Sequence, residues 1–375
     1  MKKIILFYAS YGGGHLSAAN SIKQYLEANY TDIEITMIDC VKYINRALDK
    51  VTTLAYKEMA KKAPWAWGHV YYHSQKGPLA HISTSSNKLM ALKLLRLFND
   101  IHPDLVISTH PFGSQMTSYL KKRKKVNCKL ATIMTDFAPH NQWLIGKDYI
   151  DYFFVAHTGM KTALVQSGVS EEKIFATGIP LSNRFLMHYN KEELMKEFHL
   201  EPDKKVILFF GGGEFGLGKN KTLQLLQDFI TYAPNAQIVA IAGKNEKMKM
   251  HFEELKQNSD RPNDIHVYGF SNQVPELMSI SNLVVTKPGG LTTTESLASG
   301  VPLFLINPIP GQEEENAEFL ENSGVAIWFK KHISAQECIT SLFVNEDTLQ
   351  QMKIKSRLLA KKNSTRDICE ILMKK

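Results

Sequence analysis

The chain has 375 residues, of which 44% are hydrophobic and 22% charged, so a disordered or fibrous protein is excluded and two globular domains, or one large one, are predicted. No run of about 18 apolar residues is present, so no membrane-spanning helix is predicted. The net charge of +8 at pH 7 favours anionic partners such as nucleic acid, acidic lipid surfaces or phosphorylated small molecules, although solubility alone would also account for it.

The first half of the chain alternates short β-rich apolar runs with amphipathic stretches, which predicts a parallel sheet with crossover helices. The N-terminal MKKIILFYAS has too short an apolar run for a signal peptide and is interpreted as the first strand. The four scattered cysteines, without a C-x-x-C pair, favour reduced thiols. One helix is expected over Ser17–Ala28, and strands over Ile4–Ala9, Glu34–Asp39, Leu105–Ser108, Leu130–Met134, Tyr152–Ala156 and Ile174–Ala176.

A polar, strand-free stretch from Gly178 to Lys205 then separates a second series of alternating elements. Its strands are expected from Val206 and over Gln237–Ala242, Ile265–Tyr268, Leu283–Thr286, Pro302–Ile306 and Val325–Phe329. Its helices are expected over Thr222–Tyr232, Glu246–Gln257 and Val274–Ile280, after Gly290 and from Glu313. This predicts two doubly wound α/β domains, 1–180 and 181–356, facing an interdomain cleft, with a C-terminal helix at about 357–375 that is expected to pack back on the first.

Glycine-rich loops follow strands in both halves, where backbone N–H groups can approach a ligand. The first loop, Ser10–His15, reads SYGGGH and lacks the G-x-G-x-x-G dinucleotide pattern. Its His15 is a candidate proton acceptor near pH 7, or else only a helix cap. The second loop, Phe210–Lys219, has no G-K-[ST] ending and suits a diphosphate better than a Walker A function.

The third loop, Lys287–Glu295, reads KPGGLTTTE, and its threonine hydroxyls are expected to cap the N–H groups of the following helix. Glu295 could accept hydrogen bonds from sugar hydroxyls, or only complement the helix dipole. After the strand that ends at Ile306 comes PGQEEEN, where Gln312 and Glu313 are the candidate sugar contacts. Glu314 and Glu315 are interpreted as ordinary acidic residues of a helix start.

The ordered motifs GGGH, GGGE, KPGG-x-T-x-TE and PGQE-x-x-N resemble the diacylglycerol glycosyltransferases of glycosyltransferase family 28 over almost the whole chain. These include bacterial processive glucosyltransferases and plant monogalactosyldiacylglycerol synthases; the peptidoglycan N-acetylglucosaminyltransferase is more distantly similar. The resemblance implies a GT-B fold, a UDP-sugar donor and no essential metal, and no D-x-D occurs in the chain. The substrate-binding residues it implies are Gly14, Gly213, Phe270, Val274, Gly289, Gly290, Leu291, Thr292, Thr293, Glu295, Gln312, Glu313 and Asn316.

The resemblance places the acceptor in the first domain and implies three candidate catalytic residues, His15, His110 and Asp136. The sequence leaves open which of the three is the general base. The implied reaction is direct displacement by a lipid hydroxyl with inversion, which transfers glucose or galactose to diacylglycerol as a β-glycoside.

Two basic segments predict a peripheral protein on the cytoplasmic leaflet of the cell membrane. The stretch 57–72 mixes lysines with aromatic residues and contains Lys61, Lys62, Trp65 and Trp67. The run 121–125, with Lys121 and Arg123, adds positive charge near acidic lipid. Each segment is also compatible with a purely structural role.

Three other functions are weighed against lipid glycosylation. N-acetylglucosamine transfer to a polyprenyl-linked acceptor is the nearest alternative, and a nucleotide-sugar epimerase would need no lipid. Nucleic-acid binding would explain the charge but leaves GGGH and PGQE unexplained, and no recognised nucleic-acid motif is found.

Overall fold

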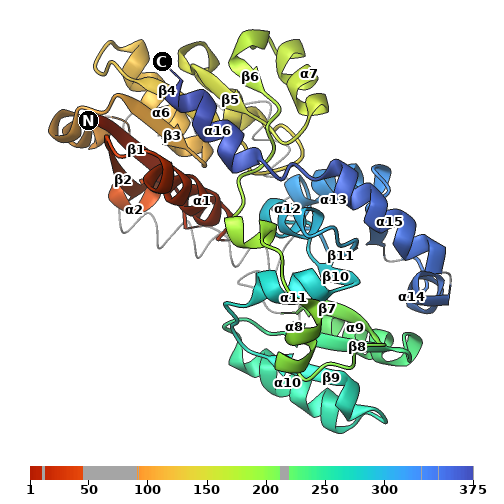
Figure 1. The fold of residues 1–375 in the computed structure, drawn as a ribbon. Helices are drawn as coiled ribbons and strands as arrows, with labels where there is room; N and C mark the ends of the chain where they lie inside the picture. Colours follow the sequence, from red (N-terminus) through yellow and green to blue (C-terminus); the bar gives the residue numbers. More distant parts are fainter. Residues whose placement is uncertain are drawn as a thin grey trace. The chain divides into compact units, whose positions relative to one another are not determined.

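The computed structural model describes residues 1–10, 13–44, 91, 93–211, 219–330, 332–344 and 346–374. The chain divides into two compact units (Figure 1). Unit 1 comprises Met1–Ser182, Pro310–Gln312 and Lys361–Lys375, and unit 2 comprises Asn183–Ile309 and Glu313–Ala360. The sequence places the boundary after residue 180.

Unit 1 is built on a six-stranded sheet in which every neighbouring pair of strands is parallel. The strand order is β2-β1-β3-β4-β5-β6, so the chain winds outward in both directions from β1. The central strands are fully buried apolar runs, as expected for a sheet covered on both faces. The strands are β1 (Lys2–Tyr8), β2 (Ile33–Asp39), β3 (Leu105–Ser108), β4 (Lys129–Ile133), β5 (Tyr152–Phe154) and β6 (Ile174–Phe175).

The helices of unit 1 follow the strands in the alternating pattern that the sequence predicts. They are α1 (Gly14–Asn29), α2 (Cys40–Ile44), α6 (Pro111–Lys122), α7 (Thr158–Gln166) and α16 (Ser364–Met373), with helical residues at 93–101 as well. Short 3₁₀ turns occur at η1 (Asn141–Leu144), η2 (Lys147–Tyr149) and η3 (Glu171–Lys173).

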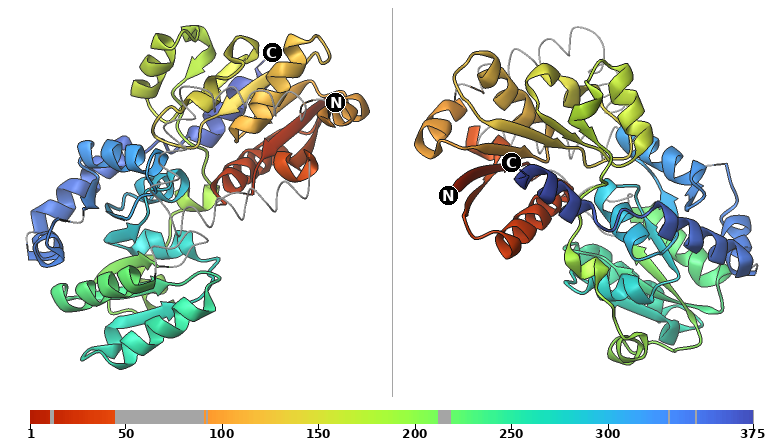
Figure 2. Two further views of the ribbon diagram at one scale, coloured as in Figure 1. Left: turned by 180° about the vertical axis from the view of Figure 1, so that it is seen from behind. Right: turned by 45° about the horizontal axis from the view of Figure 1, so that its top comes forward.

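The C-terminal helix α16 completes the core of unit 1. It packs beside α1 (Figures 1 and 2), where Ile368 and Leu372 join Ile22 and Leu26 in one buried cluster. The Lys2 ammonium donates to the Leu372 carbonyl at 3.1 Å. The end of the chain is therefore part of the first unit's fold.

Unit 2 repeats the architecture with a second parallel six-stranded sheet, ordered β12-β11-β10-β7-β8-β9. Its strands are β7 (Lys205–Phe210), β8 (Ala236–Ile241), β9 (Ile265–Tyr268), β10 (Leu283–Thr286), β11 (Leu303–Ile306) and β12 (Ala326–Phe329). Its helices are η4 (Asn183–Leu186), α8 (Lys191–Glu197), α9 (Lys219–Tyr232), α10 (Glu246–Gln257), η5 (Pro262–Asp264), α11 (Val274–Ile280), α12 (Gly290–Ala298), α13 (Gln312–Asn322), α14 (Ala335–Val344) and α15 (Glu346–Leu359).

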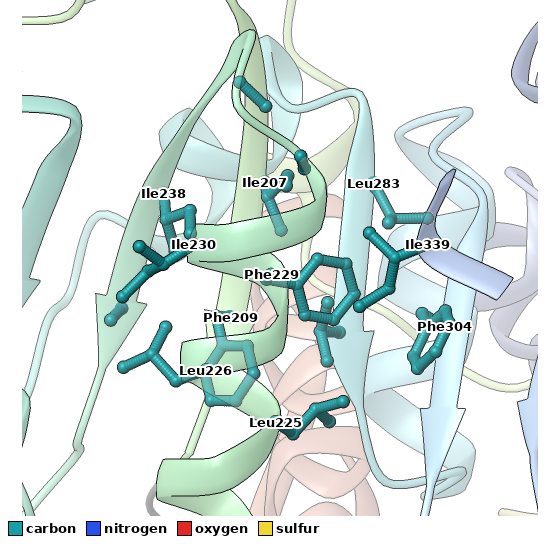
Figure 3. Close-up of a cluster of buried hydrophobic side chains, with 14 of the residues drawn as sticks. Ile207, Phe209, Leu225, Leu226, Phe229, Ile230, Ile238, Leu283, Phe304 and Ile339 are labelled. Atoms are coloured by element: carbon teal, nitrogen blue, oxygen red, sulfur yellow. The ribbon is translucent and has the colours of Figure 1, made fainter. Parts of the chain in front are cut away.

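An aromatic and aliphatic cluster lies between the sheet of unit 2 and α9 (Figure 3). Phe229 on α9 meets Phe209 of β7 and Phe304 of β11 edge-to-face, with ring centroids 6.3 and 5.1 Å apart. Ile339 of α14 packs into the same cluster and is fully buried. Burial of this apolar surface holds α9 and α14 against one face of the sheet.

The strand order of each sheet fixes where a ligand can bind. In open α/β sheets, the crevice lies at the carboxyl ends of the two strands where the winding reverses. In unit 1 these strands are β1 and β3, and in unit 2 they are β7 and β10. Gly13, Gly14 and His15 follow β1, His110 follows β3, Gly211 follows β7 and Lys287–Gly290 follow β10. These described residues of the predicted loops therefore lie at the two switch points.

Several helix boundaries differ from the prediction, and α9 begins at Lys219 rather than Thr222. Helix α1 begins at Gly14 rather than Ser17, because Gly13 takes a left-handed conformation (φ 77°) that turns the chain into the helix at once. The helix expected at about 357–375 is two elements, α15 and α16. Between them the chain enters unit 1, where the Ser364 hydroxyl donates to the Ile179 carbonyl at 2.8 Å.

Candidate active site

His15 lies in the first turn of α1 and is held by the loops that follow β3 and β4. Its Nδ1 is 2.6 Å from the Thr109 carbonyl oxygen and 3.1 Å from the Thr135 hydroxyl. The Thr109 hydroxyl in turn donates to the His15 carbonyl at 2.8 Å. A carbonyl can only accept, so Nδ1 carries the proton and Nε2 has the lone pair. The imidazole is therefore fixed as a proton acceptor at Nε2 and is not a helix cap.

Desolvation keeps this imidazole neutral. Burial lowers the pKa of His15 to about 4, and the hydrogen bond to the Thr109 carbonyl opposes that shift only in part. At pH 7 the Nε2 lone pair is available.

His110 caps α6 and holds its proton on the other nitrogen. Its Nδ1 accepts the Phe112 backbone N–H at 3.3 Å, so the neutral ring carries its proton on Nε2. The rings of His15 and His110 meet edge-on with centroids 4.7 Å apart. Burial, and then the proximity of His15, lower the pKa of His110 well below its ordinary value. In this tautomer His110 offers a donor where His15 offers an acceptor.

Asp136 follows β4 and is buried, with 7% of its surface exposed. The Gln312 side-chain amide, in the part of 310–312 that belongs to unit 1, donates to its carboxylate. The next residue is also supported, because His157 Nε2 lies 2.8 Å from the Phe137 carbonyl. The structure thus brings together two predicted site residues that lie far apart in the sequence.

Asp39, the last residue of β2, is engaged by neighbouring groups of unit 1. Its carboxylate accepts from the Ser10 hydroxyl and from the backbone N–H groups of Val41 and Lys42. The Lys42 ammonium lies 3.4 Å from the same carboxylate. This network fixes the start of the first glycine loop next to Gly13 and Gly14.

In unit 2, the N-terminus of α12 has no side-chain cap from its N-cap residue. This N-cap is Gly289, and a Cβ placed there would meet no atom of the described residues within 4 Å. Gly290 opens the helix, and no acidic residue lies in the first turn. A helix start whose N-cap offers no side-chain acceptor suits an anion, because the N–H groups of its first turn point towards it.

The expectation that the threonines cap N–H groups of α12 is wrong. The Thr293 hydroxyl donates to the Gly289 carbonyl at 2.8 Å, and the Thr294 hydroxyl donates to the Gly290 carbonyl at 2.7 Å. Inside the first turn these side chains reach backward to carbonyls, because the N–H groups point the other way along the helix axis. Leu291 is buried and Thr292 is half-buried.

The charged residues around this turn are strongly desolvated. Burial raises the pKa of Glu295 to about 8, so this carboxyl is mostly protonated at pH 7 and can donate as well as accept. Burial also lowers the pKa of Lys287 and raises that of Glu313, while the attraction between these two charges opposes both shifts. Lys287 directly follows β10 and is not among the residues predicted for the site.

The PGQEEEN segment is divided between three functions. Glu313 Oε2 accepts the Ile309 backbone N–H at 2.7 Å, so one of its oxygens shapes the turn itself. Asn316 is fully buried and its amide donates to the Pro288 carbonyl at 3.0 Å, which supports the KPGG turn. Gln312 contacts Asp136 as described above.

Phe270, a predicted binding residue, lies in the loop between β9 and α11, and Val274, another, is the first residue of α11. Val274 is half-buried, whereas 63% of the Phe270 surface is exposed. The Lys244 ammonium lies 5.4 Å from the centre of the Phe270 ring. An exposed aromatic face at the carboxyl end of β9 suits stacking on a planar base.

Gly211 and Gly213 both belong to the second glycine loop. Gly211 is a packing glycine, because a Cβ there would lie 2.2 Å from the Phe252 ring. Gly213 lies outside the described residues, as do Lys61, Lys62, Trp65 and Trp67.

The basic run 121–125 continues from α6 to the surface. Residues 122–125 are exposed, and the Arg123 guanidinium lies 5.6 Å from the centre of the Tyr119 ring. Lys121 forms an ion pair with Asp151. The charge of Lys121 is thereby partly compensated within unit 1.

Partners of the predicted residues were missed from the sequence. Thr109 and Thr135 orient His15, but only the neighbouring positions of β1, β3 and β4 bring them together. The sequence did contain a signal for Lys287, because it is the first residue of KPGG and comes directly after a predicted strand. In the described part of the chain, no group of three or more His, Cys, Asp or Glu residues is placed to hold a metal ion.

No helix among the described residues is long and apolar enough to cross a membrane. All four cysteines, each within the described ranges, are free thiols.

Comparison with known proteins agrees with this arrangement. Residues 15–181 match the family model for monogalactosyldiacylglycerol (MGDG) synthase, and residues 190–358 match that for glycosyl transferases group 1. The crystal structure of Acinetobacter baumannii MurG has a TM-score of 0.65 at 14% identity, with 100% of each chain covered. This likeness shows that the fold is GT-B.

Full-length relatives are more similar in sequence. The processive diacylglycerol beta-glucosyltransferase of Staphylococcus epidermidis is 31% identical, over 99% of this chain and 92% of its own. The protein of the same name from Bacillus subtilis is 30% identical, over 100% of this chain and 95% of its own. The chain therefore belongs to the diacylglycerol glycosyltransferases of glycosyltransferase family 28.

Proposed function

We propose that the protein transfers a hexose from a UDP-sugar to the hydroxyl group of diacylglycerol and forms a β-glycolipid at the inner face of the membrane. The observation that carries this proposal is identity of about 30% with diacylglycerol glucosyltransferases along the whole chain. The names of these relatives favour glucose as the hexose, and the family model for residues 15–181 keeps galactose as the second donor to be tested.

His15 is the proposed general base. Its Nε2 takes the proton from the lipid hydroxyl, and the hydroxyl oxygen forms a bond to the anomeric carbon of the sugar. The bond from that carbon to the diphosphate breaks at the same time, and UDP leaves with the electron pair. Attack from the face opposite the leaving group inverts the α-linked donor to a β-linked product.

The opposite tautomers of His15 and His110 favour His15 as the general base. His110 has its Nδ1 engaged by the Phe112 N–H and a proton on Nε2, so it acts as a hydrogen-bond donor to the acceptor lipid or the sugar. Asp136 is engaged by the Gln312 amide and serves to hold that residue in place. Of the three residues, His15 alone has a neutral ring nitrogen whose lone pair is left over by its fixed hydrogen bond.

Stabilisation of the leaving diphosphate is assigned to the α12 turn. The N–H groups at the start of α12, to which the N-cap Gly289 offers no side-chain cap, and the desolvated Lys287 ammonium provide positive potential without a divalent metal. The protonated Glu295 carboxyl is suited to ribose hydroxyls, and the exposed Phe270 ring to the base. Glu313 keeps its second carboxyl oxygen for the hydroxyl groups of the transferred sugar.

The purified chain is tested with diacylglycerol vesicles and, separately, UDP-glucose, UDP-galactose and UDP-N-acetylglucosamine. Mass analysis of the extracted lipids is expected to show hexosyl-diacylglycerol, with most product from UDP-glucose, and also to give the number of sugars added. Absence of glycolipid with every donor would contradict the proposal. Altered free nucleotide sugar without lipid product would identify an epimerase, and product only on a polyprenyl-linked acceptor would identify the N-acetylglucosaminyltransferase alternative.

A further inference from the structure

We propose that Arg184 is a positioning residue that holds the loop 269–273, here called the base loop, in the conformation that receives the nucleotide base. The inference rests on the proposed function, because it takes this loop as the binding place of the base. It adds a residue to which neither the motifs nor the comparisons give a role.

Arg184 contacts the base loop through one guanidinium nitrogen and the following helix α11 through another. Its Nη1 donates to the Asn272 carbonyl at 2.9 Å, and its Nη2 donates to Glu276 Oε1 at 2.7 Å. Asn272 belongs to the loop and Glu276 to the first turn of α11. A forked guanidinium can span a backbone carbonyl and a carboxylate together, which fixes the loop relative to α11.

A second contact from the same stretch of chain reaches the neighbouring loop residue. The Gln273 side-chain amide donates to Glu197 Oε1, at the end of α8, at 2.6 Å. The Tyr189 hydroxyl donates to the Arg184 carbonyl at 2.8 Å. This bond links the turn η4, which carries Arg184, to the segment that leads into α8. The segment 183–197, which opens unit 2, therefore holds two successive residues of the base loop.

The base loop needs such support because its aromatic residue is not anchored in the core. Phe270 is 63% exposed, and a cation–π contact with Lys244 is its described side-chain interaction. The position of the ring is therefore set by the backbone of the loop. Arg184 holds that backbone at Asn272, two residues after Phe270. A displaced loop would move the ring out of stacking distance of a base.

The Arg184 pair is poorly suited to a purely stabilising role. The Arg184 side chain is 46% exposed and that of Glu276 is 16% exposed, and an ion pair with one partner so exposed to water contributes little to the free energy of unfolding. The hydrogen bond to the Asn272 carbonyl depends on the position of the guanidinium beside the base loop. The effect of Arg184 is thus expected in the affinity for the nucleotide rather than in global stability.

The test compares Arg184→Gln with Lys330→Gln. Lys330 forms an ion pair of 2.7 Å with Glu321 in the same unit, and its side chain is 45% exposed, so the control removes a matched surface pair far from the base loop in sequence. Calorimetry with UDP and steady-state kinetics with the donor are measured for both. Arg184→Gln is expected to raise the Kd for UDP and the donor KM about ten-fold, with kcat at saturating donor nearly unchanged. Lys330→Gln is expected to match the wild type.

Arg184→Lys provides the conservative variant. A single ammonium keeps the attraction to Glu276 but cannot form the forked contact, so an intermediate Kd for UDP is expected. The inference is overturned if Arg184→Gln binds UDP as tightly as Lys330→Gln does, including the case in which it only unfolds at a lower temperature. A wild-type protein that does not bind UDP at all would instead refute the proposed function.

Discussion

His15 and His110 show how two identical side chains acquire opposite tautomers at the switch point of unit 1. The Thr109 carbonyl fixes a proton on Nδ1 of His15, whereas the Phe112 N–H leaves Nδ1 of His110 without one. The motif GGGH identifies His15 as a candidate, and STHPF does the same for His110. The sequence could not rank them, because the ranking depends on backbone groups of β3 and α6 that meet these rings only in the fold.

The pH dependence of turnover tests the environment of His15. Its pKa of about 4 lies below the ordinary value of 6.5, so the imidazole is a neutral base above about pH 4 and is lost as a base when the pH falls through that value. The acid limb of kcat/KM is therefore expected nearer pH 4 than 6.5. His15→Ala is expected to lose turnover by about 10²- to 10⁴-fold.

The same shift has a consequence for stability. The unfolded chain binds a proton at this histidine near pH 6.5 and the native state does not, so the native state is destabilised as the pH falls from 6.5 towards 4. Circular dichroism at each pH separates this loss from the loss of the base. An acid limb at 6.5 in folded protein would contradict the assignment of His15.

At the scale of elements, buried strands were the most predictable features. The bounds of β3, β9, β10, α10 and α11 were predicted without error, because apolar runs there are delimited by polar or turn residues. The start of α1 and the direction of the Thr293 and Thr294 hydroxyls were predicted wrongly, since both depend on backbone geometry at a glycine turn.

Arg261 joins elements of unit 2 in a way that composition does not reveal. Its guanidinium donates to the carbonyls of Ile230, Ala233, Pro234 and Ala236, where α9 ends and β8 begins. The carbonyls at the end of a helix need such donors. Arg261 therefore fixes the turn between α9 and β8.

Arg261→Lys is expected to lower the free energy of unfolding by about 2–4 kcal/mol, because one ammonium leaves several of these carbonyls without a donor. Chemical denaturation followed by tryptophan fluorescence and circular dichroism measures the change. Arg366→Lys, which alters an exposed ion pair in unit 1, is the control and is expected to shift stability by less than about 0.5 kcal/mol. Equal stability of the two variants would contradict the function given to Arg261.

At the scale of the whole molecule, two doubly wound units and their fold class follow from the sequence pattern, because alternation of strands and helices requires parallel sheets. The assignment of 310–312 and 361–375 to unit 1 did not follow in full, since it depends on long-range contacts such as Ser364 with Ile179. The net positive charge belongs to unit 1, which has 27 basic and 15 acidic side chains, whereas unit 2 has 18 basic and 22 acidic ones.

The exposed residues 122–125 are the described part of the chain best suited to acidic lipid. Arg123→Gln with Lys124→Gln is expected to weaken binding to anionic vesicles about 30-fold at low salt, from about 1 kcal/mol for each charge. Lys221→Gln with Lys247→Gln removes the same charge from exposed positions of unit 2 and is expected to have little effect. Cosedimentation measures both variants. Equal weakening in the two would attribute binding to net charge alone.

The configuration of the lipid product tests the central claim most directly. The wild-type protein is incubated with diacylglycerol vesicles and a UDP-α-hexose, and the anomeric proton of the purified glycolipid is examined by NMR. Direct displacement at the sugar carbon, with His15 as base, predicts a β-linked hexosyl-diacylglycerol that His15→Ala fails to produce at a comparable rate. An α-linked product, or no glycolipid from any UDP-hexose, would contradict the account.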